Sequence, residues 1–457
     1  MNQDTPSSRS FRPNLEVWWL NPVWTVLLMA ALLLPASYLI PDWMFREYWR
    51  MPKLIDLQVI NTCLWVVAAF VVGAFAGNTR PHTINTEGRY AWTQDLPWPF
   101  LLQMFNWSFY LTVFGYLAWA ASAVARGVSL QLILGVLQGA QEAGALMKSQ
   151  YLVTISGVTT MTQFGLVGVV LGATIGCIHG WKHVRVKVAL IMFLAIVRAV
   201  LNSERLAVIE LAIPLALVVI RLAILDSPRV IGTLRLLVIT GPVYAGGALL
   251  AMFGASEYFR SWLNFYAGHS NLTFPQFASL RLLGYYVTAI NNGALLVQRF
   301  EPTGAPFFTA HFLWRFPILS SIVTTLYPQL PFSNVDDPYT TILGVGANAE
   351  FNNGDGYLLP IIDFGFFGAM LYWFTMGLIC GWLYRMFCRK HPLGLFIYPL
   401  VFIGVTEMPR VIYWGEGRVV PAFIALGLIA YYCTSFRARA QQLSALKLQV
   451  LREPAHP

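Results

Sequence analysis

The stretch YLLPIIDFGFFGAMLYWFTMGLICGWLY, residues 357–384, contains a single acidic or basic residue, Asp363. A helix needs about 20 predominantly apolar residues to cross the hydrocarbon core of a bilayer. This stretch is long and apolar enough, so it predicts a transmembrane helix and therefore a membrane protein.

The rest of the chain has the same character. Of its 457 residues, 57% are hydrophobic and 11% are charged, and the mean hydropathy is +0.59. Ordinary globular chains carry about 25% charged residues. A soluble domain could not bury so much apolar surface, so we expect an all-α, polytopic integral membrane protein with one transmembrane domain over residues 1–457.

The same length criterion predicts about ten transmembrane helices. They are expected near residues 23–40, 57–76, 99–124, 160–180, 187–203, 205–225, 230–253, 357–384, 393–411 and 419–436.

Basic residues in the connections predict the orientation, because cytoplasmic loops are enriched in Lys and Arg. The segments GWKHVRVK (180–187) and YRMFCRKH (384–391) are strongly basic, as is the C-terminal tail. With ten spans these segments share one side with Arg9 and Arg12, so both termini are expected to be cytoplasmic. The net charge of +9 then reflects topology, and no nucleic-acid partner is expected.

The opposite face carries the segments 41–56, 125–158, 255–356 and 408–418. The longest, 255–356, is expected to be a large, functional outer loop. Within it, residues 309–328 are apolar but interrupted, which predicts a re-entrant or interfacial helix. Residues 129–149 have apolar positions at helical spacing, which predicts a helix lying on the outer membrane surface.

The common catalytic motifs for nucleotide binding, zinc proteolysis and serine hydrolysis are absent from the sequence. The seven histidines are scattered, so neither a metal site nor a cofactor is expected.

Arginine on the predicted outer side is therefore the main candidate for chemistry. The segment VRAVLNSERLAVIE (197–210) brings four charged residues between two apolar runs, although ionisable groups inside a membrane are costly and are usually functional. Arginine matches the geometry of phosphate oxygens with a planar fork of donors. We expect a site for a lipid-linked pyrophosphate, with these arginines as candidates: Arg198, Arg205, Arg281, Arg410 and Arg418.

Structural roles are open for the same residues. Arg205 beside Glu204 can form an ion pair that closes a tight turn, and Arg410 and Arg418 can be interfacial residues that extend toward water. A lone outer histidine such as His311 is commonly structural.

Four passages resemble the oligosaccharide repeat-unit polymerases, the Wzy-type O-antigen and exopolysaccharide polymerases of bacteria. They are TISGVTTMTQFG (154–165), RAVLNSERLAVIE (198–210), RLLGYYVTAINNG (281–293) and NNGDGYLLPIIDFGFFGAMLYWFTMGLICGWLY (352–384).

The resemblance implies a multi-spanning, GT-C-like glycosyltransferase of the bacterial inner membrane with a periplasmic active site. Its substrates would be oligosaccharides on undecaprenyl pyrophosphate. The growing glycan would move from its lipid carrier to the next lipid-linked repeat unit, with a chain-length regulator protein as a partner.

This chemistry assigns roles to particular residues. Arginines would stabilise the pyrophosphate leaving group without a metal, and the acceptor hydroxyl would need a base. Aromatic side chains at Tyr285, Tyr286 and Trp314 could stack on sugar rings. The candidates for the base are Glu204, Glu210, Glu407, Glu416 and His311.

Three rival functions stay open at this point. An O-antigen ligase would use the same donor but transfer the glycan to a lipid A core. A lipid-linked oligosaccharide flippase would be a transporter rather than an enzyme. A lipid-phosphate sugar transferase would place its base in the first outer loop, where Asp42 and Glu47 are available.

Overall fold

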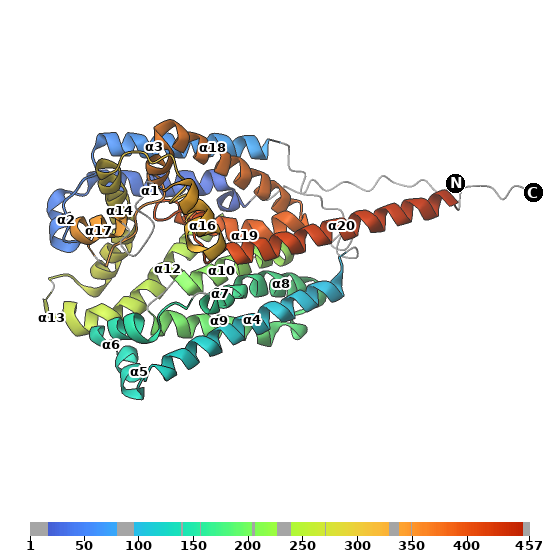
Figure 1. Cartoon of the computed structure of the whole chain (residues 1–457), viewed down its shortest axis with the longest axis horizontal. Coiled ribbons are helices and arrows are strands. Elements are labelled where there is room, and N and C mark those ends of the chain that lie inside the picture. The colour runs from blue at the N-terminus through green and yellow to red at the C-terminus, as the bar shows by residue number, and fades with distance from the viewer. Residues whose placement is uncertain are drawn as a thin grey trace, which may run out of the picture.

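The computed structural model describes residues 17–79, 96–138, 140–155, 157–202, 206–225, 239–269, 271–328, 338–348 and 350–450. Within these ranges every regular element is a helix, and no strand occurs. The long helices lie roughly side by side along the longest axis of the molecule, as Figure 1 shows. The expected all-α class is confirmed.

In the part of the chain that the structure describes, six helices are long and apolar enough to cross a membrane, so a polytopic membrane protein is confirmed. They are α1 (Pro22–Leu39), α3 (Leu57–Asn78), α4 (Trp98–Ala125), α7 with α8 (Val158–His179), α10 with η4 (Leu206–Ile224) and α18 (Leu359–Cys388).

The other four expected spans are helical for at least part of their length. They correspond to α9 (Arg185–Leu201), α12 (Gly241–Glu257), α19 (Pro392–Glu407) and the start of α20 (Val420–Val450). Of these, α19 and the segment Val420–Phe436 are apolar but shorter than the six. The count of ten therefore stays a prediction, and residues 230–238 of the expected seventh span lie outside the described residues.

Large apolar side chains cover the outer surfaces of these helices. Trp24, Leu32, Trp65, Phe75, Phe114 and Leu117 are all exposed. In water this surface would be unfavourable by about 25 cal/mol for each Å². Contact with lipid removes that cost, which explains why α1, α3 and α4 are apolar around most of their circumference.

Glycines bring α3 and α18 into close contact. A Cβ atom on Gly73 would lie 2.0 Å from the Phe374 carbonyl oxygen, and one on Gly381 would lie 2.0 Å from that of Ala74. Both helices carry a glycine pair at a spacing of four, Gly73 with Gly77 and Gly377 with Gly381. Small residues at this spacing let helix backbones approach in membranes, so these glycines set the distance between the two helices.

The short helices gather at one end of the molecule, at the left of Figure 1. They are α2 (Asp42–Tyr48), α5 (Leu130–Leu137), α6 (Gln141–Leu146), α13 (Ala267–His269) and α17 (Pro338–Gly346). All five belong to segments predicted to share the outer face, while the far half of α20 projects from the opposite end (Figure 1). Which end faces the periplasm stays a prediction from the basic residues.

The loop segments differ in detail from the expected helices. Residues 129–149 form two short helices, α5 and α6, followed by η2 (Met147–Tyr151), rather than one helix. Residues 309–328 are interrupted as expected, because α15 (Phe312–Arg315) ends before Pro317 and α16 (Pro317–Leu326) begins at it. The large loop also contains a 26-residue helix, α14 (Phe274–Arg299).

Candidate functional site

Two arginine–glutamate ion pairs meet on the turn between α19 and α20. Arg410 Nε lies 3.0 Å from Glu407 Oε2, and Arg418 Nη2 lies 3.0 Å from Glu210 Oε1. Glu407 is the last residue of α19, whereas Glu210 lies on α10 and is buried. Because α10 packs against α19 and α19 against α20, the turn residues 408–419 carry two guanidinium groups fixed by carboxylates from two helices.

The conformation of this turn follows from close backbone contacts. The N–H groups of Arg410 and Val411 both donate to the Glu407 carbonyl, which ends α19. A Cβ atom on Gly356 would lie 2.1 Å from the Met408 carbonyl oxygen, and one on Gly415 would lie 2.8 Å from that of Phe308. Glycine at these two positions allows the turn to lie between the start of α18 and the segment before α15.

Two tyrosines lie within electrostatic range of the ion pairs. Burial raises the pKa of Tyr413, the adjacent Glu210 carboxylate raises it further, and Arg418 lowers it. Burial also raises the pKa of Tyr286 on α14, again with opposite contributions from Glu407 and Arg410. Both phenols therefore stay neutral. Among the predicted aromatic residues, Tyr286 is within electrostatic range of Glu407 and the predicted Arg410.

Arg198 lies on the last turn of α9 and is buried. Its Nη1 donates to Thr162 Oγ1 at 3.1 Å, and its guanidinium carbon lies 5.5 Å from the centre of the Trp119 ring. The arginine thus joins α9 to α7 and α4. Glu204 and Arg205, which were predicted beside it, lie outside the described residues.

Arg281 is enclosed by two carboxylates and several aromatic rings. Its Nε lies 2.9 Å from Glu257 and its Nη1 lies 2.8 Å from Glu350. The guanidinium also lies over Phe277 and Phe351, and its side chain is 6% exposed. One cation with two carboxylates leaves no net positive charge. The predicted role of Arg281 in binding pyrophosphate stays a prediction, and it would require one carboxylate to be displaced.

His311 and Trp314 lie at α15, beside the turn that carries Arg418. His311 Nε2 accepts a hydrogen bond from Arg315 Nε at 3.3 Å, and Trp314 Nε1 donates to the Pro306 carbonyl at 3.3 Å. A Cβ atom on Gly417 would lie 3.5 Å from the Phe312 Cα atom. Gly417 precedes Arg418 and Phe312 follows His311, so the two segments are in contact. Tyr285, in contrast, packs between Phe253 and Phe351, inside the protein.

Asp363 positions this α15 segment, a role that sequence reasoning did not assign. Its Oδ2 accepts hydrogen bonds from the backbone N–H and the hydroxyl of Thr309, at 2.8 and 2.7 Å, and its Oδ1 accepts one from Phe308. Two residues later, Gly365 has φ of 72° within α18. In the sequence, Asp363 is a lone aspartate in an apolar run. A buried carboxylate is costly unless it is hydrogen-bonded, so this position indicated that donors should lie beside it.

Asp355 shapes the entry to α18 and was also missed. Its carboxylate accepts hydrogen bonds from the N–H groups of Gly356, Tyr357 and Leu358. Burial raises the pKa of Asp355 to about 8, although these three donors oppose that change. Because Gly356 contacts the turn at Met408, Asp355 supports the same site from the side of α18.

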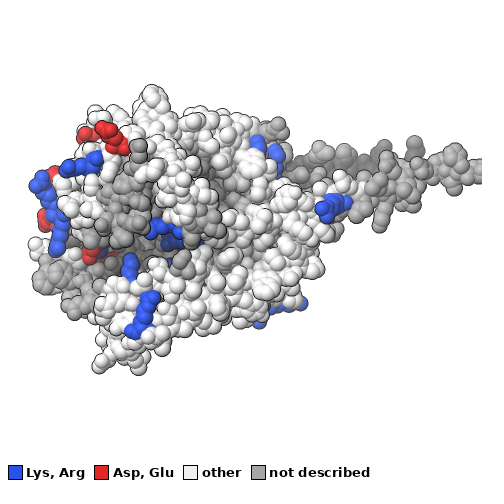
Figure 2. All heavy atoms as spheres, in the orientation of Figure 1, with Lys and Arg blue, Asp and Glu red and all other residues white. Residues whose placement is uncertain are grey.

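Basic side chains are visible at the bottom of a recess in the face drawn in Figure 2, between the regions where Figure 1 places α16 and α12. Most of the remaining viewed face is uncharged. Among the described residues, no group of three or more His, Cys, Asp or Glu side chains could bind a metal ion.

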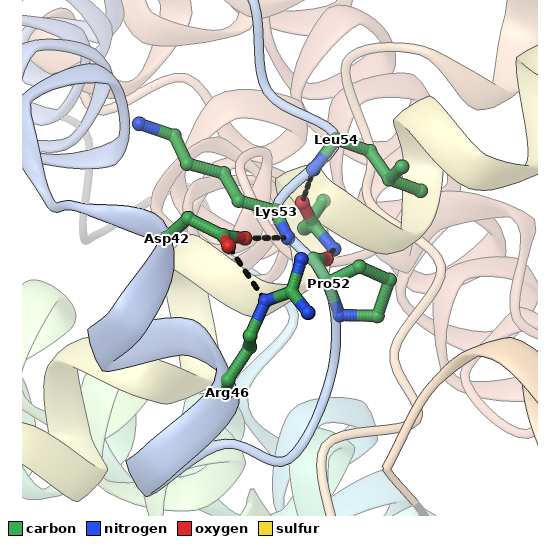
Figure 3. Close-up of polar contacts among 6 residues, drawn as sticks. Asp42, Arg46, Pro52, Lys53 and Leu54 are labelled. Atoms are coloured by element: carbon green, nitrogen blue, oxygen red, sulfur yellow. Dashed lines mark hydrogen bonds and ion pairs between the residues drawn. The ribbon is translucent and has the colours of Figure 1, made fainter.

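The segment predicted to be the first outer loop, residues 41–56, is engaged in structural contacts, as Figure 3 shows. Asp42 accepts hydrogen bonds from the Lys53 N–H at 3.0 Å and from Arg46 Nε at 2.6 Å. These two donors lower the pKa of Asp42, which makes it a poor base. Asn291 of α14 accepts a hydrogen bond from the Leu54 N–H and donates one to the Pro52 carbonyl.

Comparison of the chain with protein-family models, curated proteins and solved structures found no match. The fold and the contacts above define a polytopic helical membrane protein in which arginines pair with buried glutamates where its loop segments gather.

Proposed function

We propose that the protein is a glycosyltransferase that polymerises oligosaccharide repeat units linked to undecaprenyl pyrophosphate. The observation that carries the proposal is the turn at residues 408–419, where Arg410 and Arg418 are each paired with a buried glutamate and lie next to the segment of His311. The resemblance of four sequence passages to the polymerase family supplies the substrate class.

The geometry supports pyrophosphate binding by Arg418 in particular. Its side chain is 32% exposed, whereas that of Glu210 is 3% exposed. Glu210 can therefore fix one edge of the guanidinium from inside the protein, while part of the arginine side chain stays accessible. A pre-oriented guanidinium stabilises developing charge without reorganising at the moment of reaction. Arg410, with 18% of its side chain exposed, would assist from the start of the turn.

The reaction would proceed as a displacement at the sugar carbon linked to pyrophosphate. The acceptor hydroxyl oxygen forms the new bond to that carbon, and the bond to the pyrophosphate oxygen breaks. The arginines neutralise the charge that develops on the departing undecaprenyl pyrophosphate.

A base must take the proton from the acceptor hydroxyl. We assign this role to His311, because it lies beside the Arg418 turn and a neutral imidazole can accept a proton near neutral pH. Its Nε2 would exchange the hydrogen bond from Arg315 for the hydroxyl proton. Glu210 and Glu407 are paired with arginines, so we assign them the role of positioning residues rather than bases.

The proposal is tested by deleting the gene in its host and separating the surface glycan on a gel. Loss of the long-chain ladder with single-repeat material retained supports a polymerase. Loss of all surface glycan, with full-length polymer left on its lipid carrier, would indicate the ligase instead. An unchanged ladder would refute both functions.

A further inference from the structure

A hollow of about 420 Å³ lies on the outer surface of α4. It shares no residue with the turn at residues 408–419. It is lined by Pro99, Leu102, Gln103, Asn106, Trp107 and Tyr110. Trp119, which contacts Arg198, is about 20 Å further along the same helix at 1.5 Å per residue. The hollow therefore lies toward the end of the protein opposite the loop segments.

A lysine from another helix reaches the edge of this hollow. Lys187, on the first turn of α9, donates from Nζ to Asn106 Oδ1 at 2.6 Å. The same ammonium lies 5.3 Å from the centre of the Phe109 ring and 5.2 Å from that of Tyr110. An ammonium has three donor hydrogens, so this arrangement leaves Lys187 able to bind an anion at the hollow.

With the exposed Arg126 taken as one edge of the hydrocarbon core, the length of α4 puts Asn106, and with it Lys187, near the other edge. The helix has 28 residues and is about 42 Å long, whereas the hydrocarbon core is about 30 Å thick. The segment between Asn106 and the exposed Arg126 spans about 30 Å at the helical rise. The excess length therefore lies at the N-terminal end, where the Trp98 ring contacts His179.

The surroundings of the hollow match the headgroup region in composition. Trp107 and Tyr110 are both exposed, and such aromatic side chains concentrate at membrane interfaces. Lys182, between α8 and α9, and Arg185, the first residue of α9, are both exposed. This excess of positive charge would repel the cationic part of a zwitterionic headgroup but attract an anionic one.

We propose that this hollow binds the headgroup of an anionic bilayer phospholipid. Lys187 pairs with the lipid phosphate, Asn106 orients the lysine, and Gln103 and Asn106 contribute amide hydrogen bonds. Trp107 and Tyr110 contact the glycerol and the first part of the acyl chains.

The test measures thermal unfolding of the purified full chain in detergent on addition of phosphatidylglycerol or phosphatidylcholine. Phosphatidylglycerol should raise Tm more than phosphatidylcholine for the wild type. Lys187→Gln keeps a donor for Asn106 but removes the charge, so its affinity for phosphatidylglycerol should fall about tenfold, the effect of losing 1.4 kcal/mol. Lys148→Gln, which removes an exposed lysine on η2 far from the hollow, is the matched control and should behave as the wild type.

A second variant leaves the contact between Lys187 and Asn106 intact. Gln103→Trp fills the hollow from an exposed position and should also abolish the preference for phosphatidylglycerol. The proposal is overturned if Lys187→Gln retains the full preference, because the lysine would then only connect α4 to α9. The proposal is also overturned if both lipids stabilise the wild type equally. It is overturned as well if undecaprenyl phosphate stabilises the protein and neither phospholipid does.

Discussion

Arg418 and Glu210 lie far apart in the sequence, yet Nη2 of the arginine is 3.0 Å from Oε1 of the glutamate. The carboxylate is buried and the guanidinium is partly exposed. This asymmetry distinguishes the pair from Arg281 with Glu257, in which both side chains are almost fully buried. A partly exposed arginine that is fixed from behind can meet a ligand, whereas a fully enclosed one mainly joins helices.

Arg418→Gln should abolish most glycan elongation without preventing folding, because the amide still offers a hydrogen-bond donor to the buried Glu210 carboxylate. Losing one pre-oriented donor to a developing anion typically lowers kcat by about 10²–10³-fold. The rate is measured as polymer formed per purified enzyme, with Tm as the measure of folding. Arg46→Ala is the control, because that arginine forms an exposed ion pair with Asp42. Elongation at the wild-type rate would exclude Arg418 from the site.

Glu210→Gln should raise KM for the lipid-linked donor more than it lowers kcat. The amide keeps the shape of the side chain but cannot fix the guanidinium with a full charge, so Arg418 becomes less well oriented. If Glu210 were the general base, kcat would instead collapse and its pH profile would change. Glu210→Asp, which keeps the charge, should restore part of the affinity.

Arg281→Met should destabilise the protein strongly. It leaves the carboxylates of Glu257 and Glu350 without their cation, and breaking a buried ion pair costs about 3–5 kcal/mol. The double variant Arg281→Met with Glu257→Gln should recover part of the lost stability, measured as Tm or as the yield of monodisperse protein. A stable but inactive single variant would contradict this structural role and favour direct contact with substrate.

Elongation by the purified enzyme should continue in excess EDTA. The expectation rests on Arg410 and Arg418, which would supply the positive charge that a divalent ion supplies in other transferases. The assay compares the glycan ladder with and without chelator at constant ionic strength. Strict dependence on an added divalent ion would refute the arginine-based mechanism.

The sequence was informative about which residues are unusual but not about their partners. Hydropathy identifies the six longest apolar helices because burial in lipid depends on composition alone. The charges at Glu210 and Arg418 are visible in the same way. The pairing of these two residues cannot be predicted in this way, because it depends on α10, α19 and α20 packing together. Composition and spacing along the chain do not specify that packing.

Arg281 is a second residue whose ion-pair partners could not be predicted from the sequence. The sequence places it on a loop with tyrosines, which suggested a ligand site. Its two carboxylates come from the end of α12 and from residue 350, and neither is close to it in the chain. Asp363 was visible as a lone charge, but its three donors belong to residues 308 and 309.

Gly77→Leu should destabilise the contact between α3 and α18, because a Cβ atom at residue 77 would lie 2.3 Å from the Leu378 carbonyl oxygen. Backbone atoms cannot move aside as a flexible side chain can, so the helices must separate. Such overpacking typically costs about 1–3 kcal/mol, which should lower Tm. Gly246→Leu is the control, because a Cβ atom there has no neighbour within 4 Å. Equal Tm values for the two variants would mean that α3 and α18 are not in close contact.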